Sequence, residues 1–212
     1  MDAYQGLDQQ LIGGHWQAGT SVKTIHNLNP YTQQLIFALQ GASIVDVDSA
    51  YAAAEKAFHG QLIQSAELRK SVIQKLQDVI CARRDEIVSW LIRESGSTRL
   101  KANIEVDAAL GIIQEAGTFP DKMLTEELLS KDPQKRSFFL RKPLGVIAVI
   151  SPWNFPFHLS MRSVVTAIAC ANTVVLKPSE LTPVATLRFV ELAGGVLPPA
   201  VLNFLFAERY KQ

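Results

Sequence analysis

Two short segments in the last third of the chain contain residues whose types and spacing could support chemistry. The first is SPWNFP, residues 151–156, in which Trp153 and Asn154 stand between two prolines. Because proline fixes φ, this loop loses little entropy on ordering, and a rigid loop can aim a hydrogen-bond donor accurately. The Asn154 amide could then donate to an oxygen that gains negative charge during a reaction. The alternative, which these residues taken alone favour, is that Asn154 caps the following helix and Trp153 packs in the core.

The second segment is LKPSE, residues 176–180, in which Lys177 precedes Glu180 by three positions. A lysine and a carboxylate at this spacing could hold the two hydroxyls of a ribose. The carboxylate would also repel a 2′-phosphate, so the predicted cofactor is NAD and NADP is disfavoured. The alternative is a surface ion pair that contributes little, and it too is favoured by the residues alone. Neither G-x-G-x-x-G nor a P-loop sequence is present.

The two cysteines do not predict a nucleophile. Cys170 lies in the apolar run AIACA, with no histidine or cationic cluster nearby in the sequence to lower its pKa, so we expect a buried thiol. Cys81, on a long amphipathic helix, receives the same interpretation. The cysteines form no C-x-x-C pair and the histidines are scattered, so no metal site is predicted. Two unpaired thiols suit a reducing cytoplasm.

The elements that must position SPWNFP and LKPSE alternate along the chain. VIAVIS is apolar on both faces and predicts a buried strand, and NTVVLK and AVLNFL predict two more. Between them we expect helices at residues 158–171 and from Thr182, with Thr182 as cap and Pro183 in the first turn. This order predicts an α/β fold with a parallel sheet and right-handed crossovers. Ligands bind at the carboxyl ends of such strands, so Asn154 and Lys177 should face one crevice.

The first 130 residues predict a hairpin and helices. LIGGHWQAG reads as a hairpin with its turn at Gly13 and Gly14, and NLNPYTQQLIFAL as a turn followed by a strand. Helices are expected from about Asp46, from about residue 65 to 94 with Gly96 as its end, and over residues 102–119. A polar connection and the strand-like RSFFLRK should follow.

Composition excludes several classes of partner. The chain has 212 residues, of which 48% are hydrophobic and 19% charged, and its net charge is +1. No apolar run reaches the ~18 residues of a membrane helix, and the polar start gives no sign of a secretory signal. Without a dense Lys/Arg block we expect neither nucleic acid nor membrane as a partner. The expected location is cytoplasmic.

Taken together, these segments resemble the aldehyde dehydrogenase superfamily. KPLGVIAVISPWNFP is similar to that family's strand and Asn-bearing loop, ANTVVLKPSELTP to its cofactor-ribose segment, and LPPAVLNFL to the next strand. Weaker matches, among them LIGGHW and NPYTQQLI, precede them in the expected order. The resemblance covers about residues 10–205 and implies an incomplete Rossmann-like parallel sheet with flanking helices, preceded by a hairpin and a helical portion.

The resemblance also implies an activity and roles for residues. The family oxidises an aldehyde with NAD(P): a cysteine thiolate forms a thiohemiacetal, hydride passes to nicotinamide, and water activated by a glutamate releases the acid. Asn154 would donate to the aldehyde oxygen, and Trp153 and Phe157 would lie near the substrate tunnel. The cofactor would be contacted along its nicotinamide side by Ile150 and Ser151, and at its adenine ribose by Lys177, Ser179 and Glu180.

The sequence departs from the family in ways that carry further expectations. The family's nucleophilic cysteine and general-base glutamate lie beyond the VLNFL strand, so we expect a truncated, inactive chain without a catalytic domain. Its one incomplete cofactor-binding domain, residues 1–212, would comprise a hairpin and helical part (1–130), a bridging arm strand (131–143), a β-α-β-α-β part (144–205) and an aberrant tail (206–212). The sheet should end in an unpaired edge.

Two alternatives to an enzyme follow from these departures. One is a non-catalytic module that pairs with full-length subunits, because residues 135–143 resemble the arm through which family members form homo-oligomers. The other is a gene remnant. In addition, Gln33 and Ala171 replace glycines of the family in turns that prefer positive φ, where an extra Cβ costs about 1 kcal/mol.

Overall fold

The computed structural model describes residues 9–124, 127–128, 134–135 and 137–207, and the statements that follow concern these residues. Within them the strands are β1 (Gln10–Ile12), β2 (His15–Gln17), β3 (Thr24–Leu28), β4 (Leu35–Gln40), β5 (Glu127–Leu128), β6 (Phe138–Phe139), β7 (Val146–Ile150), β8 (Thr173–Lys177) and β9 (Leu202–Phe204). The helices are α1 (Ile44–Phe58), α2 (Gln61–Gln64), α3 (Ala66–Ala82), α4 (Arg84–Ser95), α5 (Arg99–Ala116), α6 (Phe119–Leu124), α7 (Pro156–Ala169) and α8 (Val184–Gly194).

A mixed sheet with the strand order β2-β1-β9-β8-β7 forms the centre of the molecule. β7, β8 and β9 are parallel and are joined by α7 and α8, which confirms the predicted β-α-β-α-β unit and the α/β fold class. β1 pairs antiparallel with β9 through Leu11 and Phe204. The turn at Gly13 and Gly14, both with positive φ, then leads into β2. The predicted hairpin is therefore confirmed, and it extends the same sheet.

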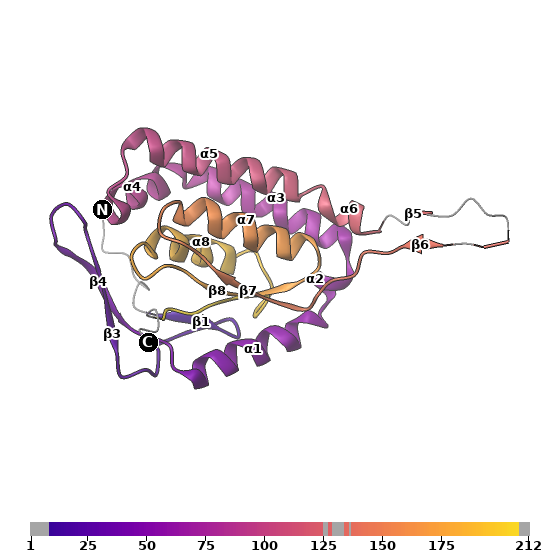
Figure 1. The fold of residues 1–212 in the computed structure, drawn as a ribbon, viewed down its shortest axis with the longest axis horizontal. Helices are drawn as coiled ribbons and strands as arrows, with labels where there is room; N and C mark the ends of the chain where they lie inside the picture. The colour runs from indigo at the N-terminus through magenta and orange to yellow at the C-terminus, as the bar shows by residue number, and fades with distance from the viewer. Residues whose placement is uncertain (1–8, 125–126, 129–133, 136, 208–212) are drawn as a thin grey trace.

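Helices cover both faces of the sheet (Figure 1). α1 packs against one face, where it contacts β7, β8 and β9, and α7 and α8 pack against the other. α3, α4 and α5 form a further layer over α7 and α8. The largest apolar cluster fills the space between the sheet and these helices, and includes the fully buried Met161, Val174 and Phe204. The outer helices can therefore reach the loops that leave the sheet.

The structure corrects the expectation that residues 146–151 form a strand buried on both faces. β7 is the last strand of its sheet, and among the residues described here no strand pairs with its outer edge. Ala148 is exposed and Ile150 is 77% exposed, whereas Val174 and Leu176 of β8 are fully buried. An apolar run predicts burial, but it does not distinguish a central strand from an edge strand. The expected unpaired edge is at β7.

The structure also corrects the single helix expected from about residue 65 to 94. Two helices, α3 and α4, meet at Arg83, whose φ of −113° and ψ of 15° interrupt the helix. Apolar residues continue through the break at helical spacing, so the pattern does not reveal it. Both helices contact α5 and α8, and α3 also packs on α7. Gly96, with φ of 66°, ends α4 as predicted.

The segment around Pro120 differs from the prediction. The expected helix at residues 102–119 is α5, which begins at Arg99 with Thr98 as its cap and ends at Ala116. Pro120 lies in the first turn of α6, where its missing N–H costs little. The expected polar connection therefore begins as helix and continues as β5, which pairs antiparallel with β6 away from the body of the molecule (Figure 1).

Parts of two expected segments, residues 131–133 and 136 of the arm and 208–212 of the tail, lie outside the described residues. In the part of the chain that is described, no helix combines the length and the apolar character needed to cross a membrane.

Three non-glycine residues among those described have a left-handed backbone, Gln33, Ala171 and Ala200, and the sequence predicts the first two. Gln33, in the turn between β3 and β4, has φ of 59°, and Ala171, after α7, has φ of 62°. Ala171 closes α7 in a Schellman motif: its N–H donates to Ile168 O at 3.0 Å, and the next N–H, of Asn172, donates to Ala167 O at 2.9 Å. The motif reverses the chain direction two residues before β8, so the strained Ala171 determines where β8 begins.

Candidate functional site at the carboxyl ends of β7 and β8

The SPWNFP and LKPSE segments lie side by side at one edge of the sheet. Ile150, the last residue of β7, is in register with Lys177, the last residue of β8. The Ser151 N–H then donates to the Lys177 carbonyl at 3.0 Å, so the ladder continues one step beyond the strands. The Thr182 hydroxyl donates to the Trp153 carbonyl at 3.4 Å and links the two loops. The expectation that Asn154 and Lys177 follow neighbouring strand ends is confirmed.

The SPWNFP loop presents Trp153 and Asn154 at the surface. Trp153 is 60% exposed and Asn154 is exposed, so neither packs in the core. The residue that precedes α7 is Phe155, and no side chain of the loop caps this helix. The alternative interpretation, in which Asn154 caps α7 and Trp153 packs in the core, is therefore wrong. The Asn154 amide is accessible to a ligand.

Buried hydroxyl groups hold the base of this loop. Ser151 is buried, and its Oγ lies 2.7 Å from Oγ of Ser160, one turn into α7. The Ser160 hydroxyl also donates to the Pro156 carbonyl at 2.6 Å. Because these groups are away from water, each needs its partner, and the loop is fixed at its start and at its end.

Phe157 faces the core. Its side chain is fully buried, and its ring packs edge to face on Phe189 of α8 with a centroid distance of 6.5 Å. The sequence prediction placed it near a substrate tunnel, but the ring here joins α7 to α8. Among the predicted tunnel residues, Trp153 presents its side chain to solvent.

In LKPSE the lysine and the glutamate form an ion pair at the carboxyl end of β8. Lys177 Nζ lies 3.3 Å from Glu180 Oε2 and donates to the Pro178 carbonyl at 3.0 Å. The two side chains remain 24% and 27% exposed. Ser179 is buried, and its Oγ accepts the Leu181 N–H at 3.2 Å, which shapes the turn.

The structure corrects the predicted start of α8. Thr182 is not its cap: the residue at the cap position is Pro183, without a side-chain hydrogen bond. A buried carboxylate from α4 takes that role, because Glu94 accepts the N–H of Val184 at 2.6 Å and of Ala185 at 2.8 Å. Burial raises the pKa of Glu94 to about 8, and the two N–H donors act in the opposite direction.

A second buried carboxylate accepts hydrogen bonds from the first N–H groups of α7. Oε1 of Glu105, on α5, accepts the N–H of Phe157 at 2.8 Å and of His158 at 3.3 Å. Burial raises the pKa of Glu105, and Lys101, 3.6 Å away, opposes this. Sequence reasoning missed both glutamates. A signal was present, since Ala102, Glu105 and Ala109 share one helix face and a charge on a buried face needs a partner.

The two cysteines lie outside the crevice. Cys170 is half-buried at the opposite end of α7 from Asn154, and burial raises the pKa of its thiol although Arg69 opposes this. Cys81 is exposed on α3, so the prediction that its thiol is buried is wrong. In the described ranges no group of three or more His, Cys, Asp or Glu side chains is arranged to hold a metal ion.

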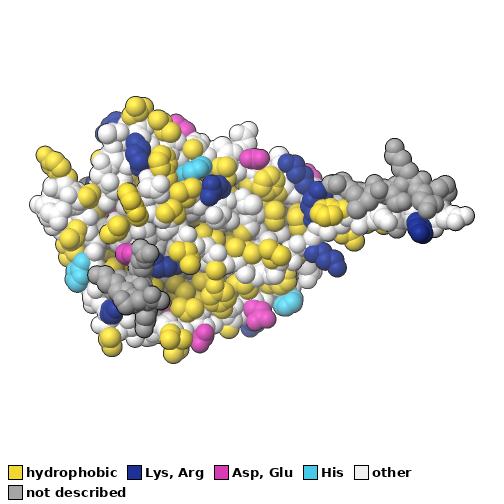
Figure 2. All heavy atoms as spheres, viewed as in Figure 1, with side chains coloured by type: hydrophobic (Ala, Val, Ile, Leu, Met, Phe, Trp, Pro, Cys, Tyr) yellow, Lys and Arg dark blue, Asp and Glu magenta, His cyan; other side chains and the backbone are white. Residues whose placement is uncertain are grey.

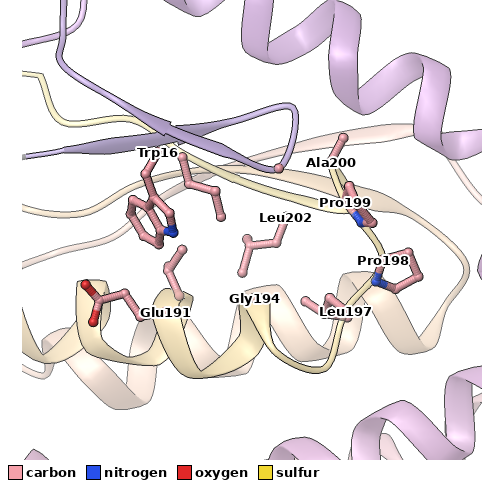
Figure 3. Close-up of a pocket in the computed structure, with 11 residues that line it drawn as sticks. Trp16, Glu191, Gly194, Leu197, Pro198, Pro199, Ala200 and Leu202 are labelled. Atoms are coloured by element: carbon pink, nitrogen blue, oxygen red, sulfur yellow. The ribbon is translucent and has the colours of Figure 1, made fainter. Parts of the chain in front are cut away.

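A separate cavity of about 180 Å³ lies where β9 begins, at the other end of the strands (Figure 3). Trp16 of the hairpin, Glu191 and Gly194 of α8, and the turn before β9 line it. None of the predicted site residues contributes to this cavity. Apolar side chains gather over the middle of the face that Figure 2 shows. Ile150 and Trp153 are among the large apolar side chains exposed on the molecule.

Comparison with known proteins gives a consistent result. A vanillin dehydrogenase of Corynebacterium glutamicum is 42% identical over 202 residues, which are 94% of this chain and 40% of that protein. Benzaldehyde dehydrogenase YfmT of Bacillus subtilis is 39% identical over 98% of this chain and 43% of its own length. The chain thus spans about two fifths of the length of the curated relatives that it matches.

Solved structures agree with these relatives. A NAD-dependent benzaldehyde dehydrogenase from Corynebacterium glutamicum matches with a TM-score of 0.87 and 39% identity, over 98% of this chain and 45% of that one. A mutant of aldehyde dehydrogenase C from Pseudomonas syringae, in complex with NAD⁺ and octanal, matches with a TM-score of 0.89 and 32% identity, over 98% and 42%. The sequence model of the aldehyde dehydrogenase family matches residues 16–211. The chain therefore belongs to the aldehyde dehydrogenase family.

Proposed function

We propose that this chain supplies the first part of the cofactor-binding unit of an NAD-dependent aldehyde dehydrogenase, with residues 144–205 as its core. The observation that carries the proposal is the juxtaposition of the exposed Asn154 loop and the Lys177–Glu180 pair at one sheet edge. Relatives whose names include vanillin and benzaldehyde support an aromatic aldehyde as the substrate of the complete protein. The exposed indole of Trp153 is suited to contact an aromatic ring.

The LKPSE residues fit the adenine ribose of NAD. The Lys177 ammonium has three N–H donors, of which two are directed to Pro178 and Glu180, so a further donor can reach a ribose hydroxyl. The partly exposed Glu180 carboxylate can accept hydrogen bonds from a diol and would repel a 2′-phosphate. The Ile150 and Ser151 backbone would lie along the nicotinamide side. When bound, NAD supplies the hydride acceptor for aldehyde oxidation.

Asn154 would stabilise negative charge on the aldehyde oxygen. Its loop is fixed by prolines and by the buried Ser151 and Ser160 hydroxyls, so its amide would be oriented before the substrate arrives. The two cysteines of these 212 residues lie away from the crevice, so no thiolate is at hand to attack a carbonyl there. We therefore expect the isolated chain to bind nucleotide without turnover.

A non-catalytic role in association is the second candidate. The observation that favours it is the unpaired outer edge of β7, with exposed Leu144, Ala148 and Ile150 along it. In this role the chain would pair with full-length subunits of the family. Co-purification with such a subunit, tested against a variant with a charge at Ala148, separates the two candidates.

The test of the proposed function is calorimetric titration of the purified chain with AMP, NAD and NADP. We expect AMP and NAD to bind, NADP to bind more weakly, and Glu180→Ala to reduce that difference. NADH formation with benzaldehyde should be absent. Equal affinity for NADP and NAD, or sustained turnover, contradicts the proposal. Glu67→Ala, an exposed glutamate on α3, is the matched control.

A further inference from the structure

Both helices that begin at the candidate site lack a local cap. α7 starts after Phe155 and α8 after Pro183, and in neither case does the residue before the helix provide a side-chain hydrogen bond. The first N–H groups of a helix need partners, and at a buried helix start water cannot supply them. In both cases the partner is a glutamate from the outer helical layer.

The two glutamates reach these helices from distant positions in the sequence. Glu94 contacts Val184 and Ala185, ninety or more residues further on, and Glu105 contacts Phe157 and His158, more than fifty residues on. Glu94 is 2% exposed and Glu105 is fully buried. A carboxylate buried this deeply is costly, so its place at a helix start indicates a specific role.

Each glutamate accepts hydrogen bonds just after one of the two site loops, the Asn154 loop or the Lys177–Glu180 loop. The N–H groups that Glu105 accepts follow Asn154 by three and four residues, and its neighbour Lys101 places Nζ 4.4 Å from the ring centre of Phe155. The N–H groups that Glu94 accepts follow Glu180 by four and five residues. The outer helices α4 and α5 thus reach through to the sheet edge.

We infer that Glu105 is a positioning residue for the Asn154 loop and that Glu94 is a positioning residue for the Lys177–Glu180 loop. The inference rests on the proposed function only for what the two loops bind. Its physical content is that each carboxylate fixes the first turn of one helix, and with it the loop that ends there. The hydrogen bonds of the two glutamates are separate, because different helices supply them and different N–H groups donate to them, although the charge of Glu105 also raises the pKa of Glu94.

The geometry predicts different responses to the same substitution. Glu105 uses one oxygen for both N–H groups, so the amide oxygen of Glu105→Gln can replace it. Glu94 uses both oxygens, one for each N–H group. In Glu94→Gln the amide nitrogen, which has no acceptor capacity, must face one of the two donors. Glu94→Gln should therefore behave like Glu94→Ala. Glu105→Gln loses the ion pair of Oε2 with Lys101 Nζ, 3.6 Å away, but should keep the hydrogen bonds to Phe157 and His158 that Glu105→Ala loses.

The experiment measures amide hydrogen exchange by NMR on the full 212-residue chain, with AMP as the ligand probe. In Glu105→Ala we expect exchange at Asn154, Phe157 and His158 to accelerate at least about tenfold, with residues 179–185 unchanged. In Glu94→Gln the pattern should be reversed, and the Kd for AMP should rise about tenfold. Glu115→Ala, an exposed glutamate on α5, should change neither loop.

Specific outcomes overturn the inference. Uniform acceleration of both loops by either substitution would mean that the glutamates support only global stability, and equal damage from Glu105→Gln and Glu105→Ala would contradict the role of the single oxygen. If Glu105→Ala does not fold, the amide exchange rates of Glu105→Gln and Glu94→Gln are compared instead. Failure of the wild type to bind AMP contradicts the proposed function. The pattern of amide exchange still tests whether each glutamate positions its own loop.

Discussion

Asn154 and Lys177 show how much of a site can be predicted from the types of single residues. Their types alone favoured a helix cap and a surface ion pair, and the resemblance implied an oxyanion donor and a ribose contact. The neighbouring strand ends follow from the β-α-β pattern. Glu94 and Glu105 could not be assigned partners in this way, because their partners are backbone N–H groups more than fifty residues away. In the sequence such a residue can be noticed only as a charged residue among the apolar residues of one helix face.

Ala171 and Gln33 carry a cost that glycine would remove. Both have φ near 60°, where a Cβ is strained. We expect Ala171→Gly and Gln33→Gly each to raise the free energy of unfolding by up to about 1 kcal/mol, measured by urea denaturation. Ala52→Gly, at an exposed position within α1, is the control and should lower it by about 1 kcal/mol. Destabilisation by Ala171→Gly would contradict the strain.

Glu94 should make stability depend on pH. Its pKa is about 8 in the folded chain and near 4.5 when unfolded, so between these values the folded state holds a proton that the unfolded state has released. Through this group alone the free energy of unfolding should therefore fall as pH rises from 5 to 8, by at most about 5 kcal/mol. Burial also raises the pKa of Glu191 to about 8, which adds a decline that substitution of Glu94 leaves in place. Glu94→Gln should flatten the total decline only in part. Denaturation curves at several pH values measure it, and an equal slope in both proteins contradicts it.

At the scale of elements, the sequence predicted the site-bearing β-α-β-α-β unit well and the helical layer less well. Strand and helix periods in residues 146–205 are clear, whereas the break at Arg83 interrupts a continuous apolar pattern without a glycine or proline. The two helices pack on the inner layer through tertiary contacts, α3 with α7 and α8 and α4 with α8, which the apolar pattern does not reveal. Likewise, the burial of β7 was mispredicted because an edge position is a property of the whole sheet.

Helix caps provide an element-scale test. The sequence names Thr182 as a cap, but the structure gives that role to Glu94, so Thr182→Val should lose only the long 3.4 Å hydrogen bond from its buried hydroxyl to the Trp153 carbonyl and should cost less than the loss of a cap. Thr98 caps α5, with its hydroxyl accepting the Lys101 N–H at 3.2 Å. Thr98→Ala should therefore cost about 1 kcal/mol. The opposite ranking in urea denaturation would mean that Thr182 is the cap after all.

At the scale of the whole molecule, the outer edge of β7 governs behaviour in solution. The strand has exposed Ala148 and Ile150 and no charged residue, and such edges pair with other chains. We expect the chain to associate as its concentration rises, and Ala148→Lys to shift it towards monomer. Size-exclusion chromatography with light scattering measures both. A wild-type chain that stays monomeric at high concentration contradicts this prediction.

The central claim is that the carboxyl ends of β7 and β8 bind the adenosine part of a nicotinamide cofactor. The most direct measurement is an NMR titration of the isotope-labelled chain with AMP, followed by the chemical shifts of backbone amides. The account predicts that shifts concentrate at Ser151 and at Lys177, Ser179 and Glu180. Shifts that instead concentrate around Trp16 and Ala200, beside the cavity at the start of β9, or no saturable shifts at all, would contradict it.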